Sequence, residues 1–189
     1  MLEIYAPYVE NTAISFEYTV PTVEEFAGRI EAVRKKFPYL AAERDGEIVG
    51  YAYASPFHSR LAYQWAVETS IYVRADQRKS GVGRALYAAL ENLLALQNVL
   101  NVNACIAYTE VEDEYLTNNS VQFHAHLGYQ LVGEFHQCGY KFGRWYGMVW
   151  MEKHLGAHPA NPPAVKPFAE VSALAATRYG IRESEPAAR

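Results

Sequence analysis

Residues 65–97 read WAVETSIYVRADQRKSGVGRALYAALENLLALQ, and this stretch decides the fold. The β-branched and aromatic side chains of residues 65–74 predict a strand. Leucines recur at helical spacing through residues 84–97, which predicts an amphipathic helix. A glycine-containing loop, residues 75–83, joins the two. This order places the N-terminus of the helix at the loop.

The loop has the features of an anion site. Its two glycines allow the backbone to approach a ligand, and the helix that follows points unpaired N–H groups at the loop. Basic side chains attract a pyrophosphate in a chain whose net charge is -4. The alternative is an ordinary glycine-bearing turn with exposed basic residues. We expect the anion to contact Arg78, Lys79, Ser80, Gly81, Val82, Gly83 and Arg84.

The rest of the chain continues in mixed α and β order, so the fold class is α/β (α+β). Capping-box spacing starts one helix, and an Asp-Gly pair marks a hairpin. The expected elements are part of a helix at 2–10, a strand at 14–18, a helix at 22–37, strands on either side of Asp45-Gly46, a strand at 102–108, a helix at 119–127, and strands near 129–137 and 144–152.

The end of the chain differs in composition. From residue 156 onward, prolines and an alanine-rich, charged segment without a clear apolar face predict an extended or disordered tail. We therefore expect one domain over residues 1–155 and a tail over residues 156–189.

Bulk composition excludes several classes of protein. The net charge of -4 provides no basic surface for nucleic acid. No apolar run approaches the roughly 18 residues that cross a bilayer, so we expect a cytoplasmic protein without a membrane partner. Cys105 and Cys138 lack the spacing of a zinc site, and we expect no metal.

Arg78, Gly81 and Gly83 resemble the R-x-x-G-x-G signature of the GNAT superfamily of N-acetyltransferases. Further segments resemble its phosphinothricin and methionine sulfoximine acetyltransferase branch, in the same order along residues 2–155. These segments are Tyr39 to Ala54, Pro56 to Val73, Ser120 to Tyr129 and Gly139 to Trp145.

The resemblance implies a GNAT fold, a mixed and mostly antiparallel sheet that splays where the cofactor enters, with helices on both faces. It implies acetyl-CoA as cosubstrate, the amine of a small amino-acid-like molecule as acceptor, and a homodimer with Tyr140 to Trp150 near the interface. Cofactor contacts are also implied at Ile71, Val73, Asn119 and Ser120.

Three features depart from the family pattern. The usual first strand is missing or displaced. Trp145-Tyr146-Gly147 stands where the herbicide-resistance enzymes read W-H-D. Thr117 stands where the family often has asparagine, a role that Asn118 or Asn119 would have to take.

The reaction requires an unprotonated amine and a stabilised leaving thiolate. Glu68 matches the glutamate that this branch uses as general base, and burial would raise its proton affinity. The alternative is a glutamate facing solvent at a strand edge. His124 is the candidate proton donor to the thiolate, although it could be an ordinary helix residue. Tyr146 is an alternative donor or an aromatic wall.

The acceptor is expected to contact Phe16, Arg60 and Tyr63. Arginine can bind a carboxylate in a two-pronged contact, whereas the alternatives are a solvated loop charge and ordinary core packing. Two other functions remain open: a GNAT enzyme that acetylates a peptide N-terminus, polyamine or aminoglycoside, and a non-catalytic acyl-CoA-binding module.

Overall fold

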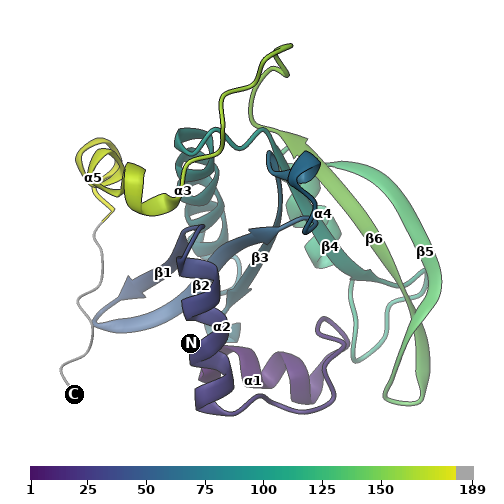
Figure 1. Cartoon of the computed structure of the whole chain (residues 1–189). Coiled ribbons are helices and arrows are strands. Elements are labelled where there is room, and N and C mark those ends of the chain that lie inside the picture. The colour runs from purple at the N-terminus through teal and green to yellow at the C-terminus, as the bar shows by residue number, and fades with distance from the viewer. Residues whose placement is uncertain (182–189) are drawn as a thin grey trace.

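The computed structural model describes residues 1–181 and contains one open sheet with helices against both faces (Figure 1). The elements are α1 (Leu2–Asn11), α2 (Val23–Arg34), β1 (Tyr39–Arg44), β2 (Glu47–Pro56), η1 (Leu61–Tyr63), β3 (Ala66–Val73), η2 (Ala75–Gln77), α3 (Val82–Leu96), β4 (Asn101–Tyr108), α4 (Asn119–His126), β5 (Gln130–Lys141), β6 (Arg144–His154) and α5 (Phe168–Tyr179).

The sheet has six strands in the order β1-β2-β3-β4-β6-β5. All neighbouring strands are antiparallel except β3 and β4, which run parallel and pair only from Ala66–Glu68 to Asn101–Asn103. Beyond this short pairing the two strands separate, while each stays bonded to its antiparallel neighbour. The prediction of a mixed, mostly antiparallel sheet that splays is confirmed.

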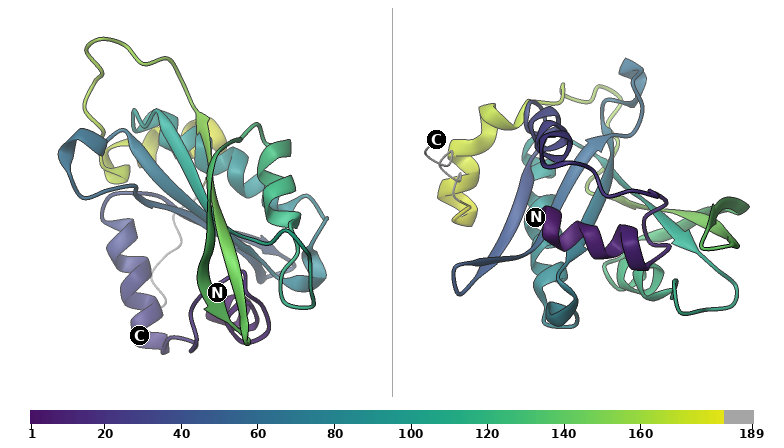
Figure 2. Two further views of the ribbon diagram at one scale, coloured as in Figure 1. Left: turned by 90° about the vertical axis from the view of Figure 1, so that its right-hand side faces the viewer. Right: turned by 90° about the horizontal axis from the view of Figure 1, so that it is seen from below.

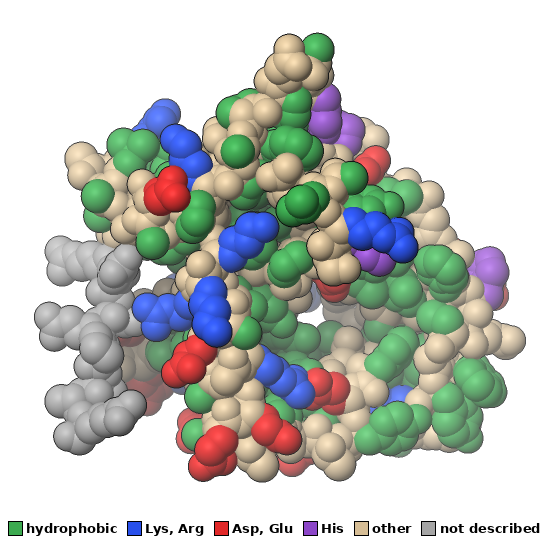
Figure 3. All heavy atoms as spheres, in the orientation of Figure 1, with side chains coloured by type: hydrophobic (Ala, Val, Ile, Leu, Met, Phe, Trp, Pro, Cys, Tyr) green, Lys and Arg blue, Asp and Glu red, His purple; other side chains and the backbone are tan. Residues whose placement is uncertain are grey.

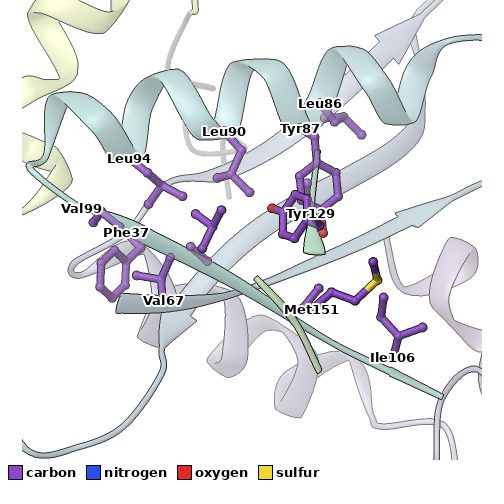
Figure 4. Packing of buried hydrophobic residues seen from close by; sticks show 14 of the residues in the cluster. Phe37, Val67, Leu86, Tyr87, Leu90, Leu94, Val99, Ile106, Tyr129 and Met151 are labelled. Atoms are coloured by element: carbon purple, nitrogen blue, oxygen red, sulfur yellow. The ribbon is translucent and has the colours of Figure 1, made fainter. Parts of the chain in front are cut away.

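Helices cover opposite faces of this sheet (Figure 2). α1 and α2 pack against the tyrosine-rich face, where Tyr5 and Phe26 contact Tyr51 and Tyr72. On the other face the leucines of α3 point at the sheet, and Figure 4 shows them above Val67 and Met151. The core therefore has two layers, one on either side of the strands.

Local signals in the sequence explain several boundaries. The Thr22 side chain accepts from the Glu25 amide and the Glu25 side chain accepts from the Thr22 amide, so the predicted capping box starts α2. Asp45 and Gly46 both have positive φ, 54° and 80°, as a tight hairpin between β1 and β2 requires. Gly128, with φ of 90°, follows α4.

The predicted strand at residues 14–18 is wrong, because this segment is an irregular loop between α1 and α2. This segment and the residue before it contact a loop and strand β5. Ala13 donates its amide to the Tyr115 carbonyl at 2.9 Å, and Phe16 covers Gly139. Within the described residues no strand precedes β1, which forms the edge of the sheet.

The expectation of an extended or disordered tail is wrong for residues 168–179, which form α5; residues 182–189 lie outside the described part. α5 packs beside α3 with Val171 and Ala175 buried. Gln97, fully buried, donates its side-chain amide to the carbonyls of Lys36 and Lys166 at 2.8 and 2.7 Å. Trp65 and Asn98 donate to the Pro163 and Ala164 carbonyls, so several side chains bond the proline-rich segment to the domain.

Gln97→Ala should therefore lower the free energy of unfolding by about 2–4 kcal/mol, because it leaves the two carbonyls unpaired and opens a cavity. Denaturant unfolding followed by fluorescence measures the change. Gln122→Ala is the matched control, since Gln122 is exposed, and it should change stability by less than about 0.5 kcal/mol. Equal stability of the two variants would contradict the proposed role of Gln97.

Candidate active site

The opening between β3 and β4 holds a cavity of about 70 Å³. Its walls come from both strands and from both faces of the sheet. Ser70 and Cys105 face it from β3 and β4, Ile14 reaches it from the α1–α2 loop, and Tyr87 and His124 reach it from α3 and α4. A molecule bound in this opening can be approached from both faces of the sheet.

The loop before α3 presents free backbone donors. Gly81 precedes the helix with φ of 87°, a conformation that favours glycine, and no side chain caps the helix. The first amide bonded within the helix is that of Ala85, which donates to the Gly81 carbonyl, so the amides of residues 82–84 have no helical partner. These amides and the helix dipole suit a phosphate.

The two glycines serve different purposes. No atom lies within 4 Å of the position a side chain would take at Gly81, whereas at Gly83 it would meet the Phe123 ring at 3.2 Å and Ile71 at 3.5 Å. Gly83 therefore allows α3 and α4 to pack closely, a role that the sequence pattern did not reveal. Substitution of Gly83 would disturb this packing as well as any ligand.

The remaining predicted cofactor residues are spread around this loop and the opening. Arg78 lies over the Tyr8 ring at 5.3 Å, Ser80 donates its hydroxyl to the Gln77 carbonyl, and Lys79 has positive φ. Arg84 is exposed on α3. Ile71 and Ser120 line the cavity, and the Val73 carbonyl accepts from Tyr8.

Asn118 and Asn119 differ in their surroundings. The Asn118 side chain donates to the Thr109 carbonyl at 2.8 Å and so fixes the loop before α4. Asn119 is exposed and donates to the Thr117 hydroxyl at 2.9 Å. Asn119 is thus the more accessible of the two.

Glu68 lies on the last paired rung before the strands separate. It is opposite Asn103 on β4 and opposite Ser55 on β2. Its side chain is half-buried, and burial raises the pKa of Glu68 above the usual value of a glutamate. A carboxylate with raised proton affinity beside the opening has the properties of a general base.

His124 belongs to a buried chain of polar groups. Its Nδ1 lies 2.7 Å from the Ser120 carbonyl and its Nε2 lies 2.9 Å from the Tyr87 hydroxyl. Burial lowers the pKa of His124, so the ring is neutral at pH 7. The carbonyl requires a proton on Nδ1, which leaves Nε2 to accept from Tyr87. Tyr87, which sequence reasoning missed, is fully buried and contacts the Thr69 hydroxyl at 3.2 Å.

The Tyr146 hydroxyl is engaged away from the opening. It donates to the Asp113 carboxylate at 2.9 Å, and burial together with Asp113 raises the pKa of Tyr146 to about 12. The same carboxylate accepts the amides of Tyr115 and Leu116 and pairs with Arg144 at 2.8 Å. Tyr146 therefore holds the loop before α4 in place.

The predicted acceptor residues fall into two groups. Phe16 packs with Ala13, Leu116 and Tyr146 beside the α1–α2 loop. Arg60 is exposed just before η1. Tyr63, in η1, lines a second pocket of about 630 Å³ on the sheet.

A buried lysine was also missed by sequence reasoning. Lys141, only 2% exposed, donates its ammonium protons to the carbonyls of Val9, Thr12 and Ser15 at 2.7, 2.9 and 2.6 Å. It joins the end of α1 and the loop that carries Ile14 to the β5–β6 hairpin. A lysine within a strand gives no local signal of such a contact.

In residues 1–181 no helix is both long and apolar enough to cross a bilayer. No group of three or more metal-binding side chains is present in the same part of the chain.

The family model described as an acetyltransferase (GNAT) domain matches residues 1–150. The chain belongs to the GNAT acetyltransferase family. The enzyme is of the N-acetyltransferase type, as the arrangement of loop, opening and carboxylate suggested.

Similar proteins within the family are acetyltransferases of phosphinothricin and of methionine sulfoximine. The phosphinothricin N-acetyltransferase of Streptomyces viridochromogenes is 31% identical over 89% of this chain and 88% of its own. The L-methionine sulfoximine/L-methionine sulfone acetyltransferase of Pseudomonas paraeruginosa is 33% identical over 86% and 91%. The crystal structure of a Sinorhizobium meliloti phosphinothricin acetyltransferase in complex with AcCoA, 33% identical, superposes with a TM-score of 0.78 over 86% of this chain and 85% of that one.

Lys141→Met should lower the free energy of unfolding by about 2–4 kcal/mol, because the change keeps an unbranched side chain but leaves buried carbonyls unpaired. Denaturant titration measures it. Lys35→Met, at an exposed lysine, is the control and should stay within about 0.5 kcal/mol of the parent. If the two variants are equally stable, the lysine contacts contribute nothing to the acceptor side of the fold.

Proposed function

We propose that this enzyme transfers the acetyl group of acetyl-CoA directly to the amine of a small amino-acid-like substrate of the phosphinothricin or methionine sulfoximine type. The observation that carries the proposal is the position of Glu68 at the point where β3 and β4 separate. Glu68 directly precedes Thr69 and Ser70, which line the cavity in the opening, and the loop suited to a phosphate follows the same strand.

Acetyl-CoA is the cosubstrate, and bound in the opening it supplies the acetyl thioester. The free amides of residues 82–84 suit its pyrophosphate, and Arg78, Lys79 and Arg84 add positive charge around the loop. Ile71, Val73, Asn119 and Ser120 lie along the path from this loop to the cavity or at its edge, and we assign them to the rest of the cofactor.

Glu68 removes a proton from the acceptor amine, directly or through a water molecule. Its raised pKa makes the carboxylate a better base than an exposed glutamate. The Cys105 thiol faces the same cavity, but burial raises its pKa to about 12, so it stays protonated and serves as a wall.

The departing thiolate is stabilised by Tyr87. Burial raises the pKa of the Tyr87 hydroxyl, so it keeps its proton. His124 Nε2 accepts that single proton before the reaction, and the hydroxyl turns it from His124 to the sulfur as the thiolate leaves. Tyr146 acts by holding the loop before α4 through Asp113, not as a proton donor.

The alternatives are less well supported. A polyamine or aminoglycoside acceptor would need free clustered acids, but Asp113 and Glu114 pair with Arg144 and Glu112 accepts the Asn118 amide. A non-catalytic acyl-CoA-binding module would have no use for a half-buried carboxylate at the opening. Phe16 remains a candidate wall of the acceptor site, and Arg60 and Tyr63, at η1, remain candidate contacts.

A homodimer is part of the proposal. Large apolar side chains are exposed on the β5–β6 hairpin, and the hydrophobic surface there is visible at the lower right of Figure 3. Tyr140 and Trp145 are the exposed large side chains of the segment expected at the interface. Light scattering at micromolar concentration should give the mass of two chains, and the mass of one would contradict this.

We place the enzyme in the cytoplasm, where acetyl-CoA is available.

Glu68→Gln should leave acetyl-CoA affinity unchanged by calorimetry and lower kcat by about 100-fold, the usual scale of a lost general base. The parent rate should fall with decreasing pH through the raised pKa of Glu68, because the protonated carboxyl cannot accept a proton. The variant should lack this limb and gain rate as pH rises, since more acceptor amine is then unprotonated. Near-normal turnover of the variant at neutral pH would exclude Glu68 as the base.

Glu43→Gln is the control, an exposed glutamate on β1 of the same sheet. It should keep parent kinetics and the parent pH profile. A panel of amines tested with the parent enzyme decides between amino-acid-like and other acceptors.

A further inference from the structure

A second pocket, distinct from the opening between β3 and β4, lies on the sheet under η1. It has a volume of about 630 Å³, within the range of small-molecule sites. Rings of Phe57, Tyr63, Phe135 and Trp150 form its walls. The Phe57 ring meets the Trp150 ring edge to face at 5.4 Å, so these walls are packed against each other.

The register of the sheet places this pocket beside Glu68. Glu68 is opposite Asn103 on β4, and Asn103 is opposite Glu152 on β6, so the three side chains stand in one row on one face. Adjacent strands are about 4.8 Å apart, which puts the backbone of Glu152 about 10 Å from that of Glu68. Asn103 and Glu152 both line the pocket. An amine held at Glu68 can thus extend over Asn103 into it.

The charged side chains that line the pocket are all acidic. Two carboxylates line it, Glu134 and Glu152, and none of the described lining residues is lysine or arginine. The Glu134 carboxylate contacts His136 at 3.0 Å, whereas the nearest basic group to Glu152 is His154 at 3.9 Å. Aromatic faces add further negative potential. The two carboxylates would repel an anionic group in this pocket, whereas an uncharged group would not be repelled and could pack against the rings.

We propose that this pocket binds the side chain of the acceptor and that Glu152 selects an uncharged side chain over an anionic one. The inference rests on the proposed function and narrows it. Among amino-acid-like amines of equal length, the enzyme should prefer a neutral sulfone to an anionic phosphinate.

The test compares kcat/KM for L-methionine sulfone and L-phosphinothricin, which share the α-amine and α-carboxylate and differ in side-chain charge. The parent enzyme should favour the sulfone by about tenfold. Glu152→Gln removes the charge and keeps the shape, so it should raise kcat/KM for phosphinothricin by about fivefold, the scale of one partly screened charge pair, and change the sulfone value less than twofold. Glu43→Gln should leave the ratio unchanged.

Trp150→Ala tests the apolar wall. It should lower kcat/KM for the sulfone by about tenfold through KM, with acetyl-CoA affinity unchanged. Leu174→Ala is the control, at a large apolar side chain on α5 that is 52% exposed and lies outside the pocket and the proposed dimer surface. Thermal unfolding of both variants shows whether they are folded.

The outcomes separate the two proposals. If acetyl-CoA binds but neither amine is acetylated, the proposed amino-acid-like acceptor is wrong. If both are acetylated and phosphinothricin is equal or better, or if Glu152→Gln leaves the ratio unchanged, the inference is overturned while the proposed function stands. If Trp150→Ala halves the mass in light scattering without changing KM, the pocket is covered by a second copy, which also overturns it.

Discussion

Strands β3 and β4 pair only over Ala66–Glu68 and Asn101–Asn103. Beyond these residues each strand has one edge without a partner strand. Backbone N–H and C=O groups on those two inner edges face each other across the opening, although β2 and β6 satisfy the outer edges. A buried opening lined with unpaired peptide groups is costly unless water or a ligand fills it. The positions of Glu68, of the phosphate loop after β3 and of α4 all follow from where the pairing stops.

Two polar networks support this opening from opposite faces. On the α3 side, Thr69, Tyr87 and His124 form a chain that is satisfied within the core. On the other face, the Asp113 carboxylate accepts from the Tyr146 hydroxyl and two backbone amides and pairs with Arg144. These contacts hold the loop before α4 in one conformation. The Thr69–Tyr87–His124 chain is buried and specifies one geometry because each unsatisfied member would be costly.

Sequence reasoning succeeded where the deciding contacts are local. The capping box at Thr22, the Asp45-Gly46 turn and the leucine face of α3 each act within a few residues, and each is confirmed. It failed at residues 14–18 and at α5, where contacts with distant segments decide the structure. Tyr87 and Lys141 were missed for the same reason: a tyrosine among leucines, or a lysine in a strand, shows its partners only once the chain has folded.

The Lys141 contacts have a consequence for the order in which the enzyme assembles. The strand, loop and helix of the phosphate site lie within residues 66–96, whereas Lys141 bonds Val9 across 132 positions of sequence. Closing so long a loop is entropically unfavourable until the intervening sheet exists. The cofactor half can therefore form early from neighbouring segments, while the wall that carries Ile14 forms late.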